Sequence, residues 1–218
     1  MSVASLWSAA REVMSHRVIQ ISTAVQTLVF AALFSTLSTT QPIFDQTFGQ
    51  GDNFPMWFAV IALCSISGSF ANSQMVRRLG MFTVIRATYA AQLVMTLVVL
   101  GLISLVPLPL SFEFGLHILW SIGIFAMMGL TMGNLNAMAM EPMGHVAGIA
   151  AAIIGSTSSI MSMVIGTIIG QMYNGTLFPV TGGFLIFSCI SMLIFSYAQR
   201  YQQKNAAAAL PAQASESL

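Results

Sequence analysis

Charge is the scarcest feature of this 218-residue chain. Only 6% of its residues are Asp, Glu, Lys or Arg, whereas 56% are hydrophobic, and the mean hydropathy is +0.84. Soluble domains carry about 25% charged residues. Because so few charges cannot cover a surface that faces water, the surface of the folded chain must face lipid. The sequence therefore predicts an integral membrane protein and excludes an ordinary soluble enzyme or binding module.

Residues that carry chemistry are also scarce. The two cysteines, Cys64 and Cys189, lie inside apolar runs without partners at metal-ligand spacing, and we expect them to be small buried hydrophobic side chains. The three histidines, His16, His117 and His145, lie at or near the ends of apolar runs. There is no paired intramembrane aspartate and no phosphate-binding loop. We therefore expect no catalytic residue, no metal and no cofactor, and a net charge of +1 gives no reason to expect a nucleic-acid partner.

Six apolar runs are each long enough to cross a bilayer as a helix, which takes about 20 residues. We expect spans at about 18–42, 55–76, 84–106, 114–140, 146–172 and 179–199. Residues that break helices or make turns separate the runs. They are Gly49, Gly51, Pro55, Gly80, Pro107, Pro109, Pro142, Gly144, Asn174, Gly175 and Pro179. The predicted fold class is all-α, a bundle of six transmembrane helices that forms one membrane domain over 18–199.

The two ends of the chain differ from the spans. In the segment 1–17, apolar side chains recur at helical spacing from Val3 to Met14 while Arg11 lies on the other side. This pattern predicts a cytoplasmic amphipathic helix at the membrane surface, and a frayed terminus is the alternative. The tail over 200–218 is rich in Ala, Gln and Ser and has no apolar face that could dock, so we expect it to be disordered.

Basic residues are distributed unevenly between the predicted loops. Six spans place both termini on one side, and all Lys and Arg residues then fall on that side: Arg11, Arg17, Arg77, Arg78, Arg86, Arg200 and Lys204. The opposite loops hold Asp45, Asp52 and Glu113. Because basic residues concentrate on the cytoplasmic side, we expect a multi-pass protein of the cell (inner) membrane with both termini cytoplasmic. Arg77, Arg78 and Gly80 then form a short cytoplasmic loop.

Small residues form a stripe along the run 146–172. Its members recur every three or four residues and so share one helix face: Gly148, Ala152, Gly155, Ser159, Ser162, Gly166 and Gly170. Small side chains let helix backbones approach closely in lipid, where no hydrophobic drive brings helices together. Two interpretations stay open, namely packing within this chain and a sliding interface between two bundles of a moving transporter.

Polar side chains inside the runs are the candidates for a binding site. Each is costly in hydrocarbon, so it should face protein or a water-filled cavity. Ser and Thr can return their hydroxyl to a preceding backbone carbonyl, whereas Asn and Gln are harder to satisfy in this way. Gln26, Thr36, Asn134 and Asn136 are the candidates for lining a substrate cavity. Hydrogen bonding between helices explains such residues as well, and both interpretations stay open at this point.

Four local motifs, in unbroken order over about 15–199, resemble one family of transporters. The stretch 133–148 (GNLNAMAMEPMGHVAG) is similar to the junction of the tenth and eleventh helices of major facilitator superfamily drug-resistance transporters of the Bcr/CflA group. The stretch 30–49, with Ser-Thr-Thr-Gln-Pro at 38–42, resembles the end of their seventh helix, and 72–80 resembles their loop between the eighth and ninth helices. The stretch 171–179 resembles the loop before their last helix.

The resemblance implies a fold and a function. Such transporters have about twelve helices in two halves, each an inverted repeat of three plus three helices, and this chain resembles the second half only. Its residues show no similarity between the first three and the last three runs, so the repeat is implied by the resemblance alone. By analogy the first and fourth runs line the cavity, and the fifth borders the other half. The implied function is antiporter-like efflux of small amphipathic solutes or drugs, driven by an ion gradient.

One six-helix half cannot close both sides of a transport pathway. We therefore expect a truncated or split half-transporter that pairs with a separate first-half bundle or with itself as a homodimer. Its other expected partners are the lipid bilayer and a small-molecule substrate. A non-transporting membrane scaffold or regulatory protein, or an inactive fragment, is the alternative.

Overall fold

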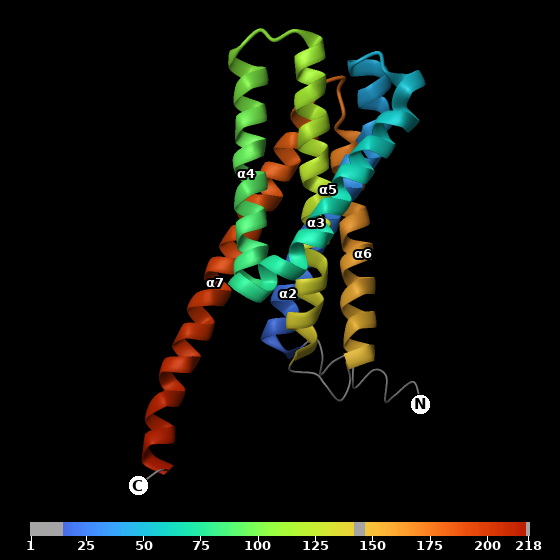
Figure 1. Ribbon diagram of the computed structural model, residues 1–218. Coiled ribbons are helices and arrows are strands. Elements are labelled where there is room, and N and C mark those ends of the chain that lie inside the picture. The colour runs from blue at the N-terminus through green and yellow to red at the C-terminus, as the bar shows by residue number, and fades with distance from the viewer. Residues whose placement is uncertain (1–14, 142–146, 217–218) are drawn as a thin grey trace, which may run out of the picture.

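The computed structural model describes residues 15–141 and 147–216, with side chains up to Ala198. The described residues contain no strand and form six long helices that run alternately up and down (Figure 1). The helices are α2 (Arg17–Pro42), α3 (Phe54–Leu79), α4 (Met81–Leu105), α5 (Leu110–Met140), α6 (Ala147–Gln171) and α7 (Phe178–Glu216). A π-helical turn, η1 (Ile43–Thr47), and a 3-10 turn, η2 (Gly51–Asn53), connect α2 to α3.

All six helices are long and apolar enough to cross a membrane. The prediction of an all-α bundle of six membrane helices is thus confirmed, and most predicted ends agree with the structure to within three residues. Apart from the C-terminal end of α7, the largest difference is at α5, which begins at Leu110 rather than near 114. Its first turn contains Glu113, whose negative charge is favourable at the positive end of the helix dipole.

Glycine makes the tightest connection, between α3 and α4. Gly80 has a φ of 79°, which L side chains rarely adopt, and its amide donates a 2.9 Å hydrogen bond to the carbonyl of Val76. α3 therefore ends and α4 begins within a single residue. The predicted loop at Arg77, Arg78 and Gly80 is a helix end followed by this turn, with both arginine side chains exposed.

The ends of the chain differ from what the sequence predicted. The expected amphipathic helix over 1–17 lies almost wholly outside the described residues. The expected disorder over 200–218 differs from the structure, in which α7 continues to Glu216, beyond the bundle (Figure 1). Four consecutive alanines at 206–209 explain the difference, because alanine has the highest helix propensity and needs no apolar face to adopt the helical backbone.

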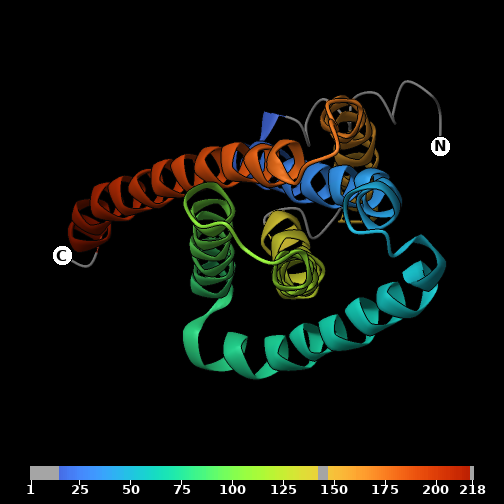
Figure 2. The same cartoon turned by 90° about the horizontal axis from the view of Figure 1, so that it is seen from above.

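The core lies around α2, the most buried of the six spans. Viewed from above, α2 and α5 lie between the remaining helices (Figure 2). Trp120 of α5 and Tyr89 of α4 are the largest fully buried side chains. The indole nitrogen of Trp120 donates a 2.9 Å hydrogen bond to the hydroxyl of Thr96 on α4, so the N–H group of this buried side chain has a partner.

The helices pack in a pattern that repeats within the chain. The most extensive contacts join α2 to α6 and α3 to α5, and further contacts join α4 to α5 and α2 to α7. The pattern is preserved when α2 is exchanged with α5, α3 with α6 and α4 with α7. The α2–α6 pair then becomes the α5–α3 pair, and the α4–α5 pair becomes the α7–α2 pair. The contacts of α4 with α7 and of α2 with α5 map onto themselves. Since α2 and α5 run in opposite directions, the two groups of three helices are related as an inverted repeat (Figure 1).

Hydrogen bonds between helices repeat in the same way. Ser65 on α3 donates a 3.2 Å hydrogen bond to the carbonyl of Ile122 on α5. Ser158 on α6 correspondingly donates a 3.3 Å hydrogen bond to the carbonyl of Thr23 on α2. The two strongest helix pairs therefore share one device, a serine on the outer helix that bonds to the backbone of the inner helix.

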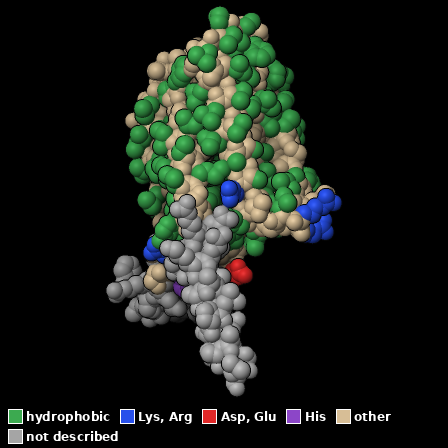
Figure 3. Space-filling view, turned by 90° about the vertical axis from the view of Figure 1, so that its left-hand side faces the viewer, with side chains coloured by type: hydrophobic (Ala, Val, Ile, Leu, Met, Phe, Trp, Pro, Cys, Tyr) green, Lys and Arg blue, Asp and Glu red, His purple; other side chains and the backbone are tan. Residues whose placement is uncertain are grey.

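Apolar side chains cover the wall of the bundle, and Lys and Arg side chains gather toward one end of it (Figure 3). Exposed side chains include Leu63, Phe70 and Leu193, which are 69%, 75% and 70% exposed. Such a surface is stable against hydrocarbon rather than water. The expectation that Cys64 and Cys189 are buried is wrong, since both are exposed on this apolar wall. A free cysteine behaves as a small hydrophobic side chain, so contact with lipid is as favourable for it as burial in a protein core.

Candidate functional site

The structure buries the polar residues predicted on α2. Gln26 and Thr36 are each 2% exposed. The Thr36 hydroxyl donates a 2.8 Å hydrogen bond to the carbonyl of Ala32 one turn earlier, so its burial needs no ligand. The side-chain oxygen of Gln26 is buried without a hydrogen-bond partner among the described residues. Gln26 is thus the more informative of the two, because a buried acceptor without a partner is costly.

The two predicted asparagines of α5 differ in environment. Asn134 is 5% exposed, and its side-chain amide donates a 2.8 Å hydrogen bond to Oδ1 of Asn72 on α3 and a 2.7 Å bond to the carbonyl of Leu130. Asn136 is half-buried. For Asn134 the structure shows the alternative of hydrogen bonding between helices. The structure does not bring Asn134 together with Gln26 and Thr36 in one of the hollows described below, so cavity lining by these residues stays a prediction.

The small-residue stripe of α6 divides into two parts at Ser162. Beyond it, a side chain at Gly166 would meet the Cβ of Phe34 at 2.7 Å, and one at Gly170 would meet the Ser38 hydroxyl, both on α2. Here the stripe is a packing face within the chain. Before Ser162 the face turns outward: nothing lies within 4 Å of a side chain built at Gly148 or Gly155, and Ser159 is exposed. In this part of α6 the buried residues are instead Ala150, Ile154 and Ser158.

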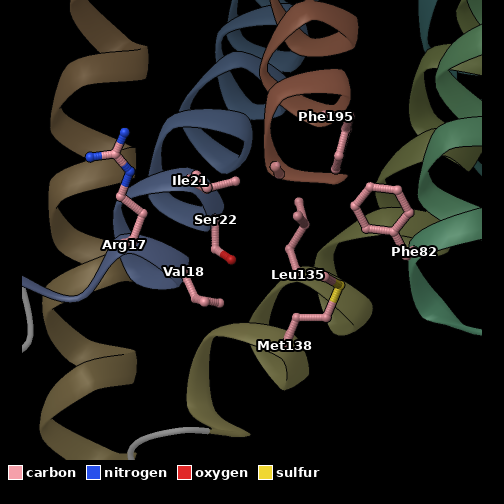
Figure 4. Close-up of a pocket in the computed structure, with 9 residues that line it drawn as sticks. Arg17, Val18, Ile21, Ser22, Phe82, Leu135, Met138 and Phe195 are labelled. Atoms are coloured by element: carbon pink, nitrogen blue, oxygen red, sulfur yellow. The ribbon is translucent and has the colours of Figure 1, made fainter. Parts of the chain in front are cut away.

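A small enclosed cavity lies between α2, α4, α5 and α7 near the basic end of the bundle. In Figure 4, Val18, Ile21 and Ser22 of α2 surround it with Phe82, Leu135, Met138 and Phe195. Arg17 lies at its edge and is held by Tyr197, whose hydroxyl accepts a hydrogen bond from the guanidinium and whose ring centre is 5.3 Å from it. The cavity volume of about 30 Å³ has room for a water molecule but not for a drug-sized ligand, which needs about 300 Å³ or more.

Two larger grooves open on the wall of the bundle. One, of about 350 Å³, lies between α2, α6 and α7 and includes Thr23, Thr157 and Ile190. The other, of about 360 Å³, lies between α3, α4 and α5 and includes Met75 and Ala91. The two grooves are related by the same inverted repeat. Exchanging α2, α6 and α7 with α5, α3 and α4 turns the helices of the first groove into those of the second. Sequence reasoning missed both grooves because their lining is mostly apolar and resembles any other membrane-facing surface.

Sequence reasoning also missed the surroundings of His117, which is 1% exposed. Its ring stacks on Trp120 with centres 6.1 Å apart, and Phe44 and Phe48 lie 6.0 and 5.8 Å away. Neither ring nitrogen has a hydrogen-bond partner in the part of the chain that the structure describes. The aromatic residues that approach from η1 and the following turn are far from His117 in sequence, so no local pattern revealed the cluster.

Metal ligands do not gather in the described residues, which contain no group of three His, Cys, Asp or Glu side chains able to hold an ion. No protein-family model, curated protein or solved structure matches the chain. The fold by itself defines the class, a multi-pass all-α membrane protein with six helices long enough to span the bilayer.

Proposed function

We propose that the chain acts in transmembrane transport, as one six-helix half of an efflux permease of the major facilitator type for small amphipathic solutes. The observation that carries the proposal is the helix pairing, which is preserved when α2–α4 are exchanged with α5–α7. Inverted repeats of this kind are common in secondary transporters, where they let a binding site open alternately to either side. The family resemblance over 15–199 supports the same function independently.

The least buried spans support a second bundle as partner. α3 and α6 are the two least buried helices, and they lie on opposite sides of the α2–α5 pair (Figure 2). On α6 the outward part of the stripe, with Gly148, Gly155 and Ser159, leaves the backbone open to close approach. Small residues of this kind favour contact between helices in lipid. We propose that α3 and α6 border a first-half bundle or a second copy of the chain, with the substrate between the bundles.

The proposed location is the cell (inner) membrane with both termini cytoplasmic. The turn at Gly80 and the start of α2 lie at the same end of the bundle (Figure 1), and they bring Arg77, Arg78 and Arg17 to that end. Asp45, in the turn that follows α2, and Glu113, in the first turn of α5, lie at the opposite end of the bundle. Positive charge on one side favours the cytoplasm for that side.

Transport by vesicles tests this proposal. The full chain is reconstituted alone and together with a six-helix first-half bundle, and efflux of a fluorescent cationic dye is followed after a pH gradient is imposed. We expect gradient-dependent efflux that requires a second bundle, from the partner or from a dimer of the chain. Absence of efflux in every combination, with the chain a monomer in detergent, would contradict transport. That result would favour the alternative, a membrane scaffold or regulatory protein.

A further inference from the structure

We propose that the groove between α3, α4 and α5 holds an acyl chain of an anionic phospholipid, whose phosphate lies on Arg78 at the end of the groove. The inference depends on the membrane fold and not on transport. Its basis is the joining of an apolar groove to a basic side chain at one membrane surface.

The groove has the lining that an acyl chain requires. Ala87, Ala91 and Ala126 form part of its walls, together with Met127 and Leu130, and its volume is about 360 Å³. Two polar side chains line it, and each donates a hydrogen bond within the protein. Thr88 donates a 2.8 Å hydrogen bond to the carbonyl of Val84, and Gln92 donates a 3.1 Å bond to the carbonyl of Trp120. A guest in this groove therefore finds contact surface rather than hydrogen-bonding groups, which suits a hydrocarbon chain.

The groove lies at the depth of one lipid leaflet. Its α4 residues run from Ala87 to Gln92, which are seven and twelve residues beyond the turn at Gly80. With a rise of about 1.5 Å per residue, they lie about 10 to 18 Å from the turn along the helix. Half of the hydrocarbon core is about 15 Å thick. The groove thus begins within the leaflet at the α3–α4 turn and ends near the bilayer midplane, so an acyl chain from that leaflet can extend along it.

A basic side chain lies where the lipid headgroup would be. Gln74, Met75, Arg78 and Leu79 line a hollow at the end of α3, and Met75 borders both this hollow and the groove. Arg78 is exposed, and its guanidinium suits a phosphate. Pockets that combine basic residues with the end of a membrane helix are typical sites for anionic lipid headgroups. Charge and shape therefore select an anionic phospholipid over a lipid without net charge or a peptide.

Native mass spectrometry of the full chain in detergent, titrated with phosphatidylglycerol or phosphatidylcholine, tests the inference. We expect tighter binding of phosphatidylglycerol, and R78Q should weaken it about fivefold, because one basic residue near an anionic lipid contributes about that factor. R77Q is the matched control: it removes the same charge from the neighbouring residue, which does not line the hollow, and should have the smaller effect. Inorganic phosphate at millimolar concentration should not displace the lipid.

The acyl chain is tested by filling the groove. A91W places an indole in the groove from an exposed position and should abolish retention of phosphatidylglycerol, while M161W fills the other groove and should leave it unchanged. Circular dichroism checks that both variants keep their helices. Equal binding of the two lipids, equal effects of R77Q and R78Q, or undiminished binding to folded A91W would overturn the proposal. Displacement by inorganic phosphate would also overturn it, because it would show an anion site without a role for the groove.

Discussion

Asn134 on α5 and Asn72 on α3 are joined by a 2.8 Å hydrogen bond between their side chains. α3 has few buried residues, namely Ile61, Ser65 and Gly68, so this bond and the one from Ser65 to the carbonyl of Ile122 are prominent among its contacts. In hydrocarbon an unpaired amide would be costly, so the pair favours a single register of α3 against α5.

A double-mutant cycle measures this pair. N72A and N134A should each destabilise the bundle, and the double variant should be less destabilised than the sum by about 0.5 to 1.5 kcal/mol, the range for hydrogen bonds between membrane helices. Unfolding in mixed micelles of mild detergent and dodecyl sulfate gives the free energies. Strict additivity would show that the two side chains do not interact, and Asn134 would then be free for the predicted role in a cavity.

Close approach of α6 to α2 makes a second prediction. A Cβ at Gly166 would lie 2.7 Å from the Cβ of Phe34 and 3.1 Å from the amide nitrogen of Ser35, so G166V should destabilise the bundle by about 1 to 3 kcal/mol. G155V is the control on the same helix, because nothing lies within 4 Å of the added Cβ, and it should change stability by less than about 0.5 kcal/mol. The same unfolding assay compares them. If both variants were equally destabilised, the cause would lie in the α6 backbone and not in its contact with α2.

Substitution of His117, unlike the preceding substitutions, is expected to keep or increase the stability of the bundle. Its buried ring nitrogens have no hydrogen-bond partner among the described residues, whereas the ring packs between aromatic side chains. H117F keeps the aromatic contacts and removes the unsatisfied groups, so it should leave stability unchanged or raise it by about 1 kcal/mol. W120F in the same cluster removes the hydrogen bond to Thr96 and leaves a cavity at a fully buried position, so it should lower stability by about 1 to 3 kcal/mol. A thermal shift measurement in detergent compares the two, and a strong loss of stability in H117F would assign its nitrogens a structural or functional partner.

The spans were predictable from the sequence because length and hydropathy alone determine which segments can cross a bilayer. Turn residues such as Gly80 and Pro107 placed the neighbouring helix ends to within three residues, since their backbone preferences are local. The internal repeat was not visible in the residues. Close helix contacts in lipid require only small side chains, and Gly, Ala and Ser exchange freely in that role, as at Gly68 against Ala126 and Gly170 against Ser38.

The candidate site was predictable only in part, because burial depends on which helices meet. The stripe on α6 shared one face by spacing, but the structure buries the line through Ile154 and Ser158 before Ser162 and leaves Gly155 and Ser159 open. A helix wheel cannot distinguish two adjacent faces that are both made of small residues. The polar partner of Asn134 likewise comes from α3, 62 residues away in the chain.

The central claim, six membrane spans with both described ends on the cytoplasmic side, is tested by cysteine accessibility in whole cells. Cys64 and Cys189 are first replaced by alanine, which is expected to be tolerated because both face the apolar wall. Single cysteines are then introduced at exposed positions. Those for the outer ends are Q46C, S111C and Q171C, and those for the inner ends are L79C and E141C.

A membrane-impermeant maleimide should label the three outer positions in intact cells and the two inner positions only after the membrane is opened. This alternation requires α3, α4, α5 and α6 each to cross the membrane, because every loop then lies opposite its neighbours in the chain. It also places the loop after α2 and the loop before α7 on the outer side, as six spans with cytoplasmic ends require. Labelling of any inner position in intact cells, or protection of any outer position, would contradict the spans and orientation on which the proposed function depends.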